Sequence, residues 1–389
     1  MMRVHALQKG SNAERSRHRN RQAVLGQVHA AGSIGRAEIA RSLSLTTQTV
    51  SNIISELSDD GMLIEKGRRS VGRGLPAMQY ALNPKGGYAL GIEVRPDAVF
   101  AALLNLQGDL VTTERVALDD ISPDTVLHHV TTLYDRALAQ VPGARDRMLG
   151  AGVVMPGPFG VTGVAGQGSD LSGWQELDAE ELFTDAIDLP IALSNDANAA
   201  AMAERINGVA QGLATYAYIY FGAGLGLGLI HNGQIMKGAF GNAGEIGHIP
   251  IPLSGGKLES VLSRLSVQRH LSDAGKDAHD IEALGHLFQQ RDPDLMEWLG
   301  TATKALGYAL AIVENMFDPQ TVVLGGAMPD AVLDHLVAET PLPDLSVSNR
   351  PTAPHPRLMR GASGRMTATQ GAAALILNRA LTSPLSHAH

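Results

Sequence analysis

The chain has 389 residues, of which 44% are hydrophobic, and a formal net charge of −8. This length exceeds the roughly 250–300 residues at which a single hydrophobic core stops growing, so at least two folding units are expected. The sequence contains no cysteine, which excludes disulfide bonds and thiolate metal sites and is compatible with a cytoplasmic location.

The charge is unevenly distributed along the chain. Residues 1–85 carry a net charge of +7, and the remainder carries −15. A basic head on an acidic body indicates a DNA-binding module attached to a sensor, because neutralising phosphates supplies affinity for nucleic acid. A solvated basic tail is the alternative. Residues 1–20 are polar and basic without an apolar run, which predicts a flexible lead-in and not a secretory signal.

Three consecutive helices are predicted after the lead-in. Residues 21–30 repeat apolar side chains at helical spacing, and Gly32 ends this helix. Ser33 can cap a second helix, and residues 46–58 form a third. The apolar face of the third helix consists of Val50, Ile53, Ile54 and Leu57. Helix, tight turn and helix is the arrangement of a helix-turn-helix.

The exposed side of the third helix carries short and medium hydrogen-bonding side chains, and no carboxylate occurs before Glu56. Acidic side chains would be repelled by phosphates, so this composition favours reading DNA in the major groove over packing in an ordinary helical bundle. The residues of the helix-turn-helix expected to contact DNA are Arg36, which precedes the third helix, and Thr46, Thr47, Gln48, Thr49, Ser51 and Asn52 within it.

A two-stranded wing is predicted next. Two apolar segments, 62–64 and 77–82, flank a basic glycine-rich loop. Arg73 stands between glycines in this loop, which suits an extended backbone in the narrow minor groove. A plain hairpin tip without a DNA contact is the alternative.

Past residue 86 the apolar pattern changes from helical to alternating, and one order of elements occurs twice. The first set has strands at 88–94, 98–106 and 109–116, a helix at 123–139 and a buried strand at 149–155. The second has strands at 215–221, 225–231 and 234–236, helices that include 293–317, and a strand at 321–324. The repeat predicts two related lobes facing a cleft, where small ligands bind.

The run from Leu213 to Ile230 has no charge and approaches the length of a membrane-spanning helix. Its alternating glycines, at positions 222, 224, 226 and 228, are unfavourable in a helix. They instead predict a buried hairpin whose backbone closely approaches a neighbour, so no membrane partner is expected.

Five motifs together resemble the ROK family (repressors, open reading frames and kinases), and specifically its winged-helix regulators such as the xylose and N-acetylglucosamine repressors. They are MPGPFG at 155–160, SDLSGW at 169–174, SNDANAAAMAER at 194–205, GNAGEIGHIPI at 241–251 and VVLGGAM at 322–328. The resemblance extends from about Arg21 to the final helix. It implies an actin-like, hexokinase-like (ribonuclease H-like, duplicated) body that binds a sugar between its lobes.

The resemblance also implies the ligand-binding residues. In the family, an Asn-Asp pair after a buried strand and the Glu and His of a Gly-Glu-x-Gly-His motif contact the sugar, and in the kinases the Asp is the general base. The positions that match are Gly157, Asp170, Asn195, Asp196, Glu245 and His248, although relatives commonly carry Asn at position 170.

Simpler explanations exist for some of these residues. Asn195 and Asp196 could merely cap the helix that begins near Ala197. His248 could be a satisfied core histidine, and Trp174 is expected to pack in the core and not to stack on a sugar.

Kinases of this fold bind ATP phosphates with an Asp-x-Gly-Gly-Thr loop and a Gly-Thr-Gly loop. This chain has GIEVRPD at 91–97 and Gly-Ala-Gly at 222–224, so glycines and hydroxyls are missing. Phosphoryl transfer depends on positioning and neutralising the phosphates, and we therefore expect no kinase activity. The glycine-rich segment GAGLGLG at 222–228 is similar to a dinucleotide-binding fingerprint, but such a fingerprint requires a following helix and here a strand follows. We therefore do not expect a dinucleotide site.

Most relatives follow the motif histidine with a cysteine cluster that completes a zinc site. Here His248 is followed by IPIPLSGGKLESVLS, which has no thiol, so neither zinc nor another cofactor is expected.

The sequence therefore predicts an α+β and α/β protein in four parts: the lead-in 1–20, a winged helix-turn-helix over 21–84, a first actin-like lobe over 85–197 completed by a C-terminal helix at about 364–385, and a second lobe over 198–363. We expect a sugar-responsive repressor that binds operator DNA; the family resemblance implies a homodimer, with a tetramer as the alternative. A sugar kinase with an appended DNA-binding domain and a ligand-independent DNA-binding protein are the alternatives.

Overall fold

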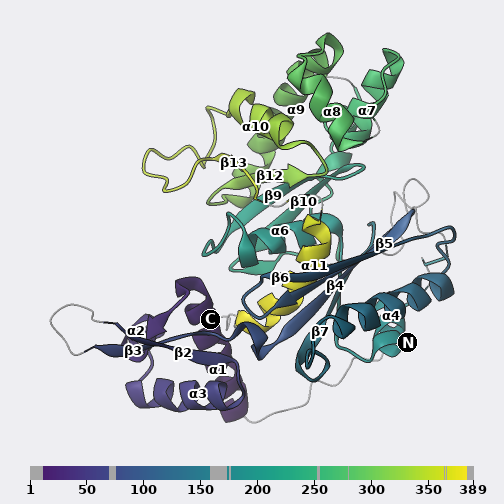
Figure 1. Ribbon diagram of the computed structural model, residues 1–389. Helices are drawn as coiled ribbons and strands as arrows, with labels where there is room; N and C mark the ends of the chain where they lie inside the picture. The colour runs from purple at the N-terminus through teal and green to yellow at the C-terminus, as the bar shows by residue number, and fades with distance from the viewer. Residues whose placement is uncertain are drawn as a thin grey trace.

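The computed structural model describes residues 12–69, 76–157, 173–174, 177–251, 255–278, 280–362, 364 and 366–382. Figure 1 shows an N-terminal helical unit beside a body built on two sheets, with helices α6 and α11 between the sheets. Arg73 and Asp170, two of the predicted contact residues, lie outside the described residues.

The N-terminal unit consists of three helices and a small antiparallel sheet. Its helices are α1 (Asn12–Ala31), α2 (Arg36–Ser42) and α3 (Thr47–Asp59). Its strands are β1 (Ile34–Gly35), β2 (Leu63–Arg69) and β3 (Ala77–Leu82), in the order β1-β3-β2. The apolar faces of the helices are buried together, so the amphipathic pattern produces the expected core.

Two expectations for this unit need correction. Helix α1 begins at Asn12, so residues 12–20 belong to a helix and not to a flexible lead-in. Arg17 and Arg21 pair with Glu56 on α3, and these tertiary contacts are invisible to a pattern of apolar spacing. The second helix does not start after Ser33 but after Gly35, because Ile34–Gly35 pairs with β3 as a short strand.

The first lobe contains a five-stranded sheet in the order β6-β5-β4-β7-β8. Its strands are β4 (Tyr88–Arg95), β5 (Ala98–Asn105), β6 (Leu110–Ala117), β7 (Met148–Val154) and β8 (Ile191–Ser194). Strands β4 to β6 are antiparallel, whereas β7 runs parallel to β4 and β8. Helices α4 (Pro123–Ala139) and α5 (Ala179–Ile187) share a core with one face of this sheet.

Helix α11 (Thr367–Leu381) packs against β4 and β7 of the first lobe. A Cβ atom at Gly91 would lie 2.0 Å from the carbonyl oxygen of Thr369, and one at Gly152 would lie 1.8 Å from that of Ala372. Only glycine fits at these two positions, and this lets the helix lie directly on the strands.

The second lobe repeats the topology with the order β11-β10-β9-β12-β13. Its strands are β9 (Tyr216–Phe221), β10 (Leu225–His231), β11 (Gln234–Ile235), β12 (Val322–Gly326) and β13 (Leu358–Arg360). Its outer helices are α7 (Arg264–Asp273), α8 (Ile281–Gln289), α9 (Pro293–Phe317) and α10 (Asp330–Glu339). Strands β9 to β11 are antiparallel and β12 is parallel to β9, so the repeat predicted from the sequence is present.

The uncharged run at 213–230 forms the hairpin β9–β10, as expected. Its glycines face helix α6 (Asp196–Asn207): a Cβ at Gly226 would lie 2.7 Å from the Cβ of Ala197, and one at Gly228 would lie 2.4 Å from its carbonyl oxygen. Within the described residues, no helix has the length and apolar character needed to span a membrane.

Candidate functional site

The Asn-Asp pair lies where β8 gives way to α6. Asn195 is the N-cap of this helix, and its side-chain oxygen accepts a 2.9 Å hydrogen bond from the backbone N–H of Asn198. Oδ1 of Asp196 accepts a 2.8 Å bond from the N–H of Ala197. The capping interactions are therefore real. The other carboxylate oxygen of Asp196, Oδ2, lies beside Gly222: a Cβ atom added at Gly222 would be 3.1 Å from it.

Asp196 has a perturbed pKa. The pKa of its carboxyl is raised to about 6, chiefly by burial and in addition by the nearby carboxylates of Glu93 and Glu245, against the lowering effect of the Ala197 N–H. A carboxyl that titrates near neutrality beside other acids is typical of functional sites.

Gly157, Glu245 and Asn195 come together from three separate loops. A Cβ atom at Gly157 would lie 3.8 Å from Oε1 of Glu245 and 3.9 Å from the Cβ of Asn195. Burial raises the pKa of Glu245 as well, while His248 opposes this effect. Five of the six ligand-binding residues predicted from the sequence thus gather near the N-terminus of α6, and the sixth, Asp170, lies outside the described residues.

His248 is half-exposed and has polar neighbours on both sides. Its Nε2 lies 3.9 Å from Oε2 of Glu245, and its Nδ1 lies 3.1 Å from Nζ of Lys257. It is therefore not a core histidine surrounded by apolar groups. Trp174, by contrast, is buried, stacks on Phe183 and donates a 2.9 Å bond to the carbonyl of Ile121, which confirms its packing role.

Glu93 and Tyr220 belong to the same region, although the sequence did not single them out as site residues. Glu93 is only 4% exposed; its Oε1 accepts from Nε of Arg95 at 2.6 Å, and its Oε2 accepts from the hydroxyl of Thr369 at 2.6 Å. Burial and the charges of Asp196 and Glu93 raise the pKa of the buried Tyr220 phenol. Glu93 occurs in the segment compared with a phosphate loop, and that comparison was the signal that could have identified it.

The side chain of Arg95, in the segment at 91–97, contacts neighbouring residues of the same sheet. The Arg95 guanidinium lies 4.5 Å from the centre of the Phe100 ring, in addition to its bond to Glu93. Between β9 and β10, a Cβ at Gly224 would lie 2.8 Å from Oε2 of Glu259, so a second acidic side chain borders the Gly-Ala-Gly turn.

On the polar face of α3, four of the predicted residues are exposed and two, Thr49 and Ser51, are half-exposed. Thr46 caps the helix by accepting a 3.1 Å bond from the N–H of Thr49, Ser51 bonds to the carbonyl of Thr47, and Gln48 donates a 2.9 Å bond to Asn52. Arg36 is also exposed and donates to the hydroxyl of Tyr80 on β3. The ion pair with Arg17 holds the Glu56 carboxylate toward α1 and lowers its pKa.

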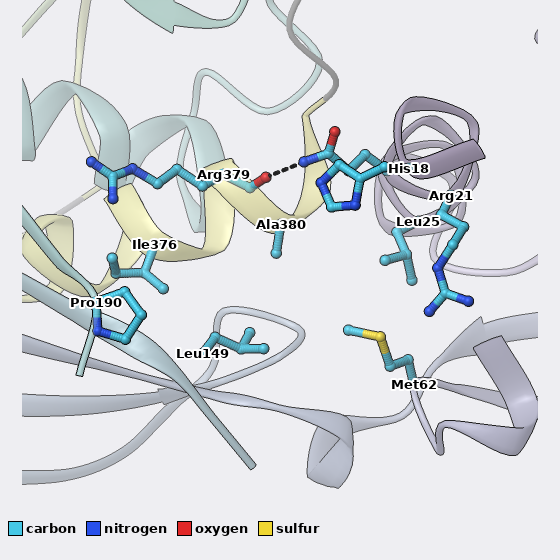
Figure 2. Close-up of a pocket in the computed structure, with 10 residues that line it drawn as sticks. His18, Arg21, Leu25, Met62, Leu149, Pro190, Ile376, Arg379 and Ala380 are labelled. Carbon is cyan, nitrogen blue, oxygen red and sulfur yellow. Dashed lines mark hydrogen bonds between the residues drawn. The ribbon is translucent and has the colours of Figure 1, made fainter. Parts of the chain in front are cut away.

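The joint between the N-terminal unit and the body lies at the end of α11. The amide of Gln22 on α1 donates a 2.7 Å bond to the carbonyl of Arg379, drawn as the dashed line in Figure 2. A Cβ at Gly26 would lie 2.2 Å from the carbonyl oxygen of Leu381, so α1 and α11 are in direct backbone contact. A cavity of about 320 Å³ remains beside this contact, lined among others by Arg21, Leu25, Met62, Leu149, Ile376 and Arg379.

Helix α6 also reaches this joint. Arg205, near its C-terminal end, donates a 3.1 Å bond to Asn378 of α11. The following Ile206 packs against Gly108, and Gln107 in the same turn donates to the carbonyl of Leu82 and accepts from the ring of His29 on α1. Of the two helices that begin at the candidate site, α11 thus ends against the N-terminal unit, and α6 ends against α11 and the turn that contacts this unit.

Comparison with known proteins agrees with this architecture. The model of the ROK family matches residues 89–379. The xylose repressor of Bacillus subtilis (strain 168) is 26% identical over 315 residues, which represent 78% of this chain and 81% of that protein. A solved ROK family transcriptional regulator, described as a homologue of the E. coli MLC protein, superimposes on 94% of this chain and 97% of its own, with a TM-score of 0.72 and 24% identity.

A kinase also shares the fold of the body. The ROK family glucokinase from Streptomyces griseus, solved with glucose and AMPPNP, superimposes on 74% of this chain and 99% of its own, with a TM-score of 0.57 and 22% identity. Two lobes of repeated topology joined by α6 and α11 define an actin-like body. The chain belongs to the ROK family.

Proposed function

We propose that this protein is a sugar-responsive transcriptional repressor. Its N-terminal unit is a winged helix-turn-helix that binds operator DNA, and its body binds a sugar or sugar derivative near the N-terminus of α6. Two relatives support this proposal: a xylose repressor matches 78% of this chain, and a solved transcriptional regulator superimposes on 94% of it, a share larger than the body alone.

In this proposal Asn195, Asp196, Glu245 and His248 hold the sugar hydroxyls. Adjacent amide and carboxylate groups supply donors and acceptors that match neighbouring hydroxyls. Gly157 leaves the space between Asn195 and Glu245 free of a side chain, which supports a ligand at this position.

The observation that carries the proposal is the course of α6 and α11. Both begin at the candidate site, at Asp196 and near Glu93, and both end against the N-terminal unit or the turn that supports it. A sugar that binds one arrangement of these helices more tightly than another shifts the protein toward that arrangement. DNA affinity then changes because the two arrangements hold the N-terminal unit differently.

A sugar kinase with a DNA-binding unit is the second candidate. Asp196 is retained, and its pKa of about 6 suits a general base. Two features argue against this function. Arg95, bonded to Glu93, stands in the segment where kinases have the glycines of a phosphate loop. Ala223 stands where kinases have a residue with a hydroxyl group.

One pair of measurements separates these functions. Binding to the DNA upstream of the protein's own gene is measured with D-xylose, D-glucose or N-acetylglucosamine added in turn, and the same sugars are incubated with MgATP. We expect one sugar class to change DNA affinity and no sugar phosphate to form. Sugar phosphate above the level of an Asp196→Asn control establishes the kinase, and DNA binding that no sugar changes contradicts the sensor.

A further inference from the structure

The cavity of about 320 Å³ between the N-terminal unit and the body has walls from both parts of the protein, and we call it the joint cavity. Leu25 and Met62 of the N-terminal unit and Leu149 and Ile376 of the body make much of its lining apolar. Leu25 and Ile376 are buried. The volume lies in the range of small-molecule sites. An occupant would therefore contact α1 and α11 at the same time, with its apolar part removed from water.

Arg379 stands at the exposed edge of the joint cavity and supplies a positive charge. One Nη of its guanidinium donates a 3.1 Å bond to the carbonyl of Ile191, and within the described residues no carboxylate pairs with it. Arg21, which also lines the cavity, is already paired with Glu56 and Asp60. No acidic residue is among the described residues of the lining. A carboxylate on an occupant would therefore pair with Arg379, because a guanidinium group binds a carboxylate with two parallel hydrogen bonds.

Gln22 contributes a second polar group to the wall of the cavity. It is only 9% exposed, and its Nε2 is bonded to the carbonyl of Arg379. Its Oε1 is buried and accepts no hydrogen bond within the described part of the chain. A buried acceptor without a donor is unfavourable and rare, so it indicates a group that the chain itself does not supply. A donor on an occupant would satisfy Oε1 after a small rotation of the amide.

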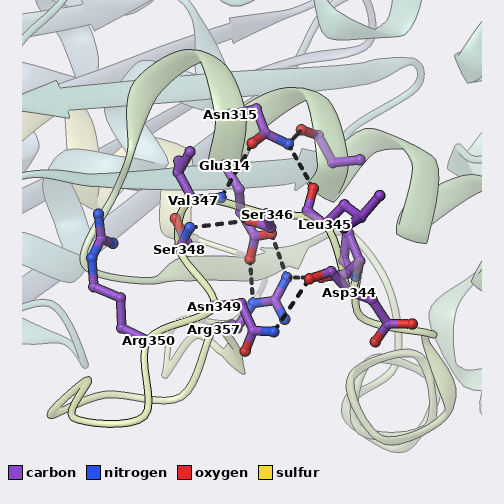
Figure 3. A network of polar contacts seen from close by, with 12 residues as sticks. Glu314, Asn315, Asp344, Leu345, Ser346, Val347, Ser348, Asn349, Arg350 and Arg357 are labelled. Atoms are coloured by element: carbon purple, nitrogen blue, oxygen red, sulfur yellow. Dashed lines mark hydrogen bonds and ion pairs between the residues drawn. The ribbon is translucent and has the colours of Figure 1, made fainter.

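A second cavity, of about 240 Å³, provides a contrast. It is lined by the end of α9 and the loop at 348–357, part of which is drawn in Figure 3. Arg357 donates to both carboxylate oxygens of the buried Glu314, at 2.8 and 2.6 Å, and Arg350 pairs with Asp318. Each arginine of this lining thus has an acidic partner within the protein. The arginine at the edge of the joint cavity does not, and this difference favours the joint cavity as the site for an anion.

We propose that the joint cavity binds a small organic acid that carries a hydrogen-bond donor at the end opposite its carboxylate. The carboxylate pairs with Arg379, the apolar body lies against Leu25 and Ile376, and the donor reaches Gln22. Figure 2 shows the guanidinium of Arg379 pointing away from the carbonyl that Gln22 contacts, so the two polar groups of the ligand lie at opposite ends. Because the ligand contacts α1 and α11 together, it stabilises their docked arrangement.

Isothermal titration calorimetry on the full-length protein tests this site without DNA or sugar. The probe is para-hydroxybenzoate, which has both polar groups; benzoate lacks the donor, and phenol lacks the carboxylate. We expect para-hydroxybenzoate to bind and the two other compounds to bind about tenfold more weakly or worse. Absence of para-hydroxybenzoate binding overturns the proposal. Phenol that binds as tightly overturns the pairing with Arg379, and benzoate that binds as tightly overturns the role of Gln22.

Variants locate the ligand in the cavity. Arg379→Gln should weaken binding of para-hydroxybenzoate by about tenfold and leave that of phenol unchanged, because only the carboxylate loses its partner. Leu149→Trp fills the cavity and should abolish binding of all three compounds. Arg350→Gln, in the lining of the second cavity, is the control and should bind like the wild type. Circular dichroism verifies that the variants are folded. Wild-type affinity in folded Arg379→Gln or Leu149→Trp overturns the proposal.

Amide hydrogen exchange tests whether the ligand holds α1 against α11. At about ten times its dissociation constant, para-hydroxybenzoate should slow exchange in α1 by about tenfold, because only the docked arrangement binds it. Exchange in α8, which contributes no residue to the cavity, should not change. Unchanged exchange in α1 under these conditions overturns the stabilisation of the docked arrangement. None of these results depends on whether the protein binds a sugar or an operator.

Discussion

The hydroxyl of Thr369 donates a 2.6 Å hydrogen bond to Oε2 of Glu93, which joins the first turn of α11 to the end of β4. Both side chains are buried, and the second carboxylate oxygen of Glu93 is held by Arg95. This contact fixes the end of α11 that lies at the candidate sugar site, while the other end of the helix contacts α1.

Removing this hydrogen bond should destabilise the protein. Thr369→Val keeps the shape of the side chain but leaves a buried carboxylate oxygen without its donor, so the free energy of unfolding should fall by about 1–3 kcal/mol. Urea denaturation measures this change. Thr132→Val, at a half-exposed position on α4, serves as the control and should stay within about 0.5 kcal/mol of the wild type. Equal stability of the two variants would refute the role assigned to Thr369.

Asp196 should make stability depend on pH. Its pKa is raised to about 6 from an ordinary value of 3.8, so between these values the folded protein binds the proton more tightly than the unfolded chain. Stability therefore falls as the pH rises from about 4 to about 6 and stays lower above this range. Asp196→Asn should remove the decrease and raise stability at pH 7 by roughly 1–3 kcal/mol. Thermal unfolding across pH 4–8 measures the profile, with Asp185→Asn on the exposed side of α5 as the control.

The same titration should govern sugar binding. The ionised carboxylate of Asp196 accepts hydrogen bonds from two hydroxyls, whereas the protonated form loses part of this capacity. Affinity for the active sugar should therefore rise by about tenfold between pH 5 and pH 7. Calorimetry at several pH values measures it. Affinity that does not change with pH would place the ligand away from Asp196.

Gln48 and Asn52 should determine base preference. Their side chains are hydrogen-bonded to each other on the exposed face of α3, so they are already ordered for contact with base edges. Alanine at either position should weaken operator binding by about 1–3 kcal/mol and relax preference at one base pair. Fluorescence anisotropy at fixed salt measures both effects, with Ser58→Ala in the last turn as the control. Equal weakening on every sequence would reassign these residues to phosphate contacts.

Gly26→Ala should disturb the joint without disturbing the helix itself. The added methyl group would lie 2.2 Å from the carbonyl of Leu381, so α1 must move away from α11 even though alanine favours helix formation. Sugar binding should persist, while the change in DNA affinity caused by sugar should shrink by about tenfold or more. Gly300→Ala is the matched control, because nothing lies within 4 Å of its Cβ position. An unchanged sugar response in Gly26→Ala would exclude the α1–α11 contact from the coupling.

Local pattern was sufficient for most of the fold. The repeated order of strands and helices and the close approach at the glycines of β10 follow from spacing and residue type within short windows. The N-terminal extension of α1 could not be predicted from local pattern, because it depends on ion pairs between residues far apart in sequence, such as Arg17 and Glu56. Gly35 as a helix cap likewise depends on the pairing of β1 with β3.

The candidate site was predictable where one motif contains the chemistry. Asn195, Asp196, Glu245 and His248 each stand in a recognisable segment. Glu93 was missed as a site residue because its segment was compared with a phosphate loop only for what it lacks, and its partner Thr369 lies 276 residues away. No local pattern can reveal such a pair.

Helix α11 has a consequence for synthesis of the protein. It is the last helix along the described chain, yet it covers β4 and β7 of the first lobe and supports α1 of the N-terminal unit. The ribosome must therefore synthesise α11, up to Leu381, before the N-terminal unit can dock on this helix. A chain that stops before α11 lacks the backbone against which Gly26 and Gln22 of α1 pack, so its N-terminal unit has no fixed position on the body.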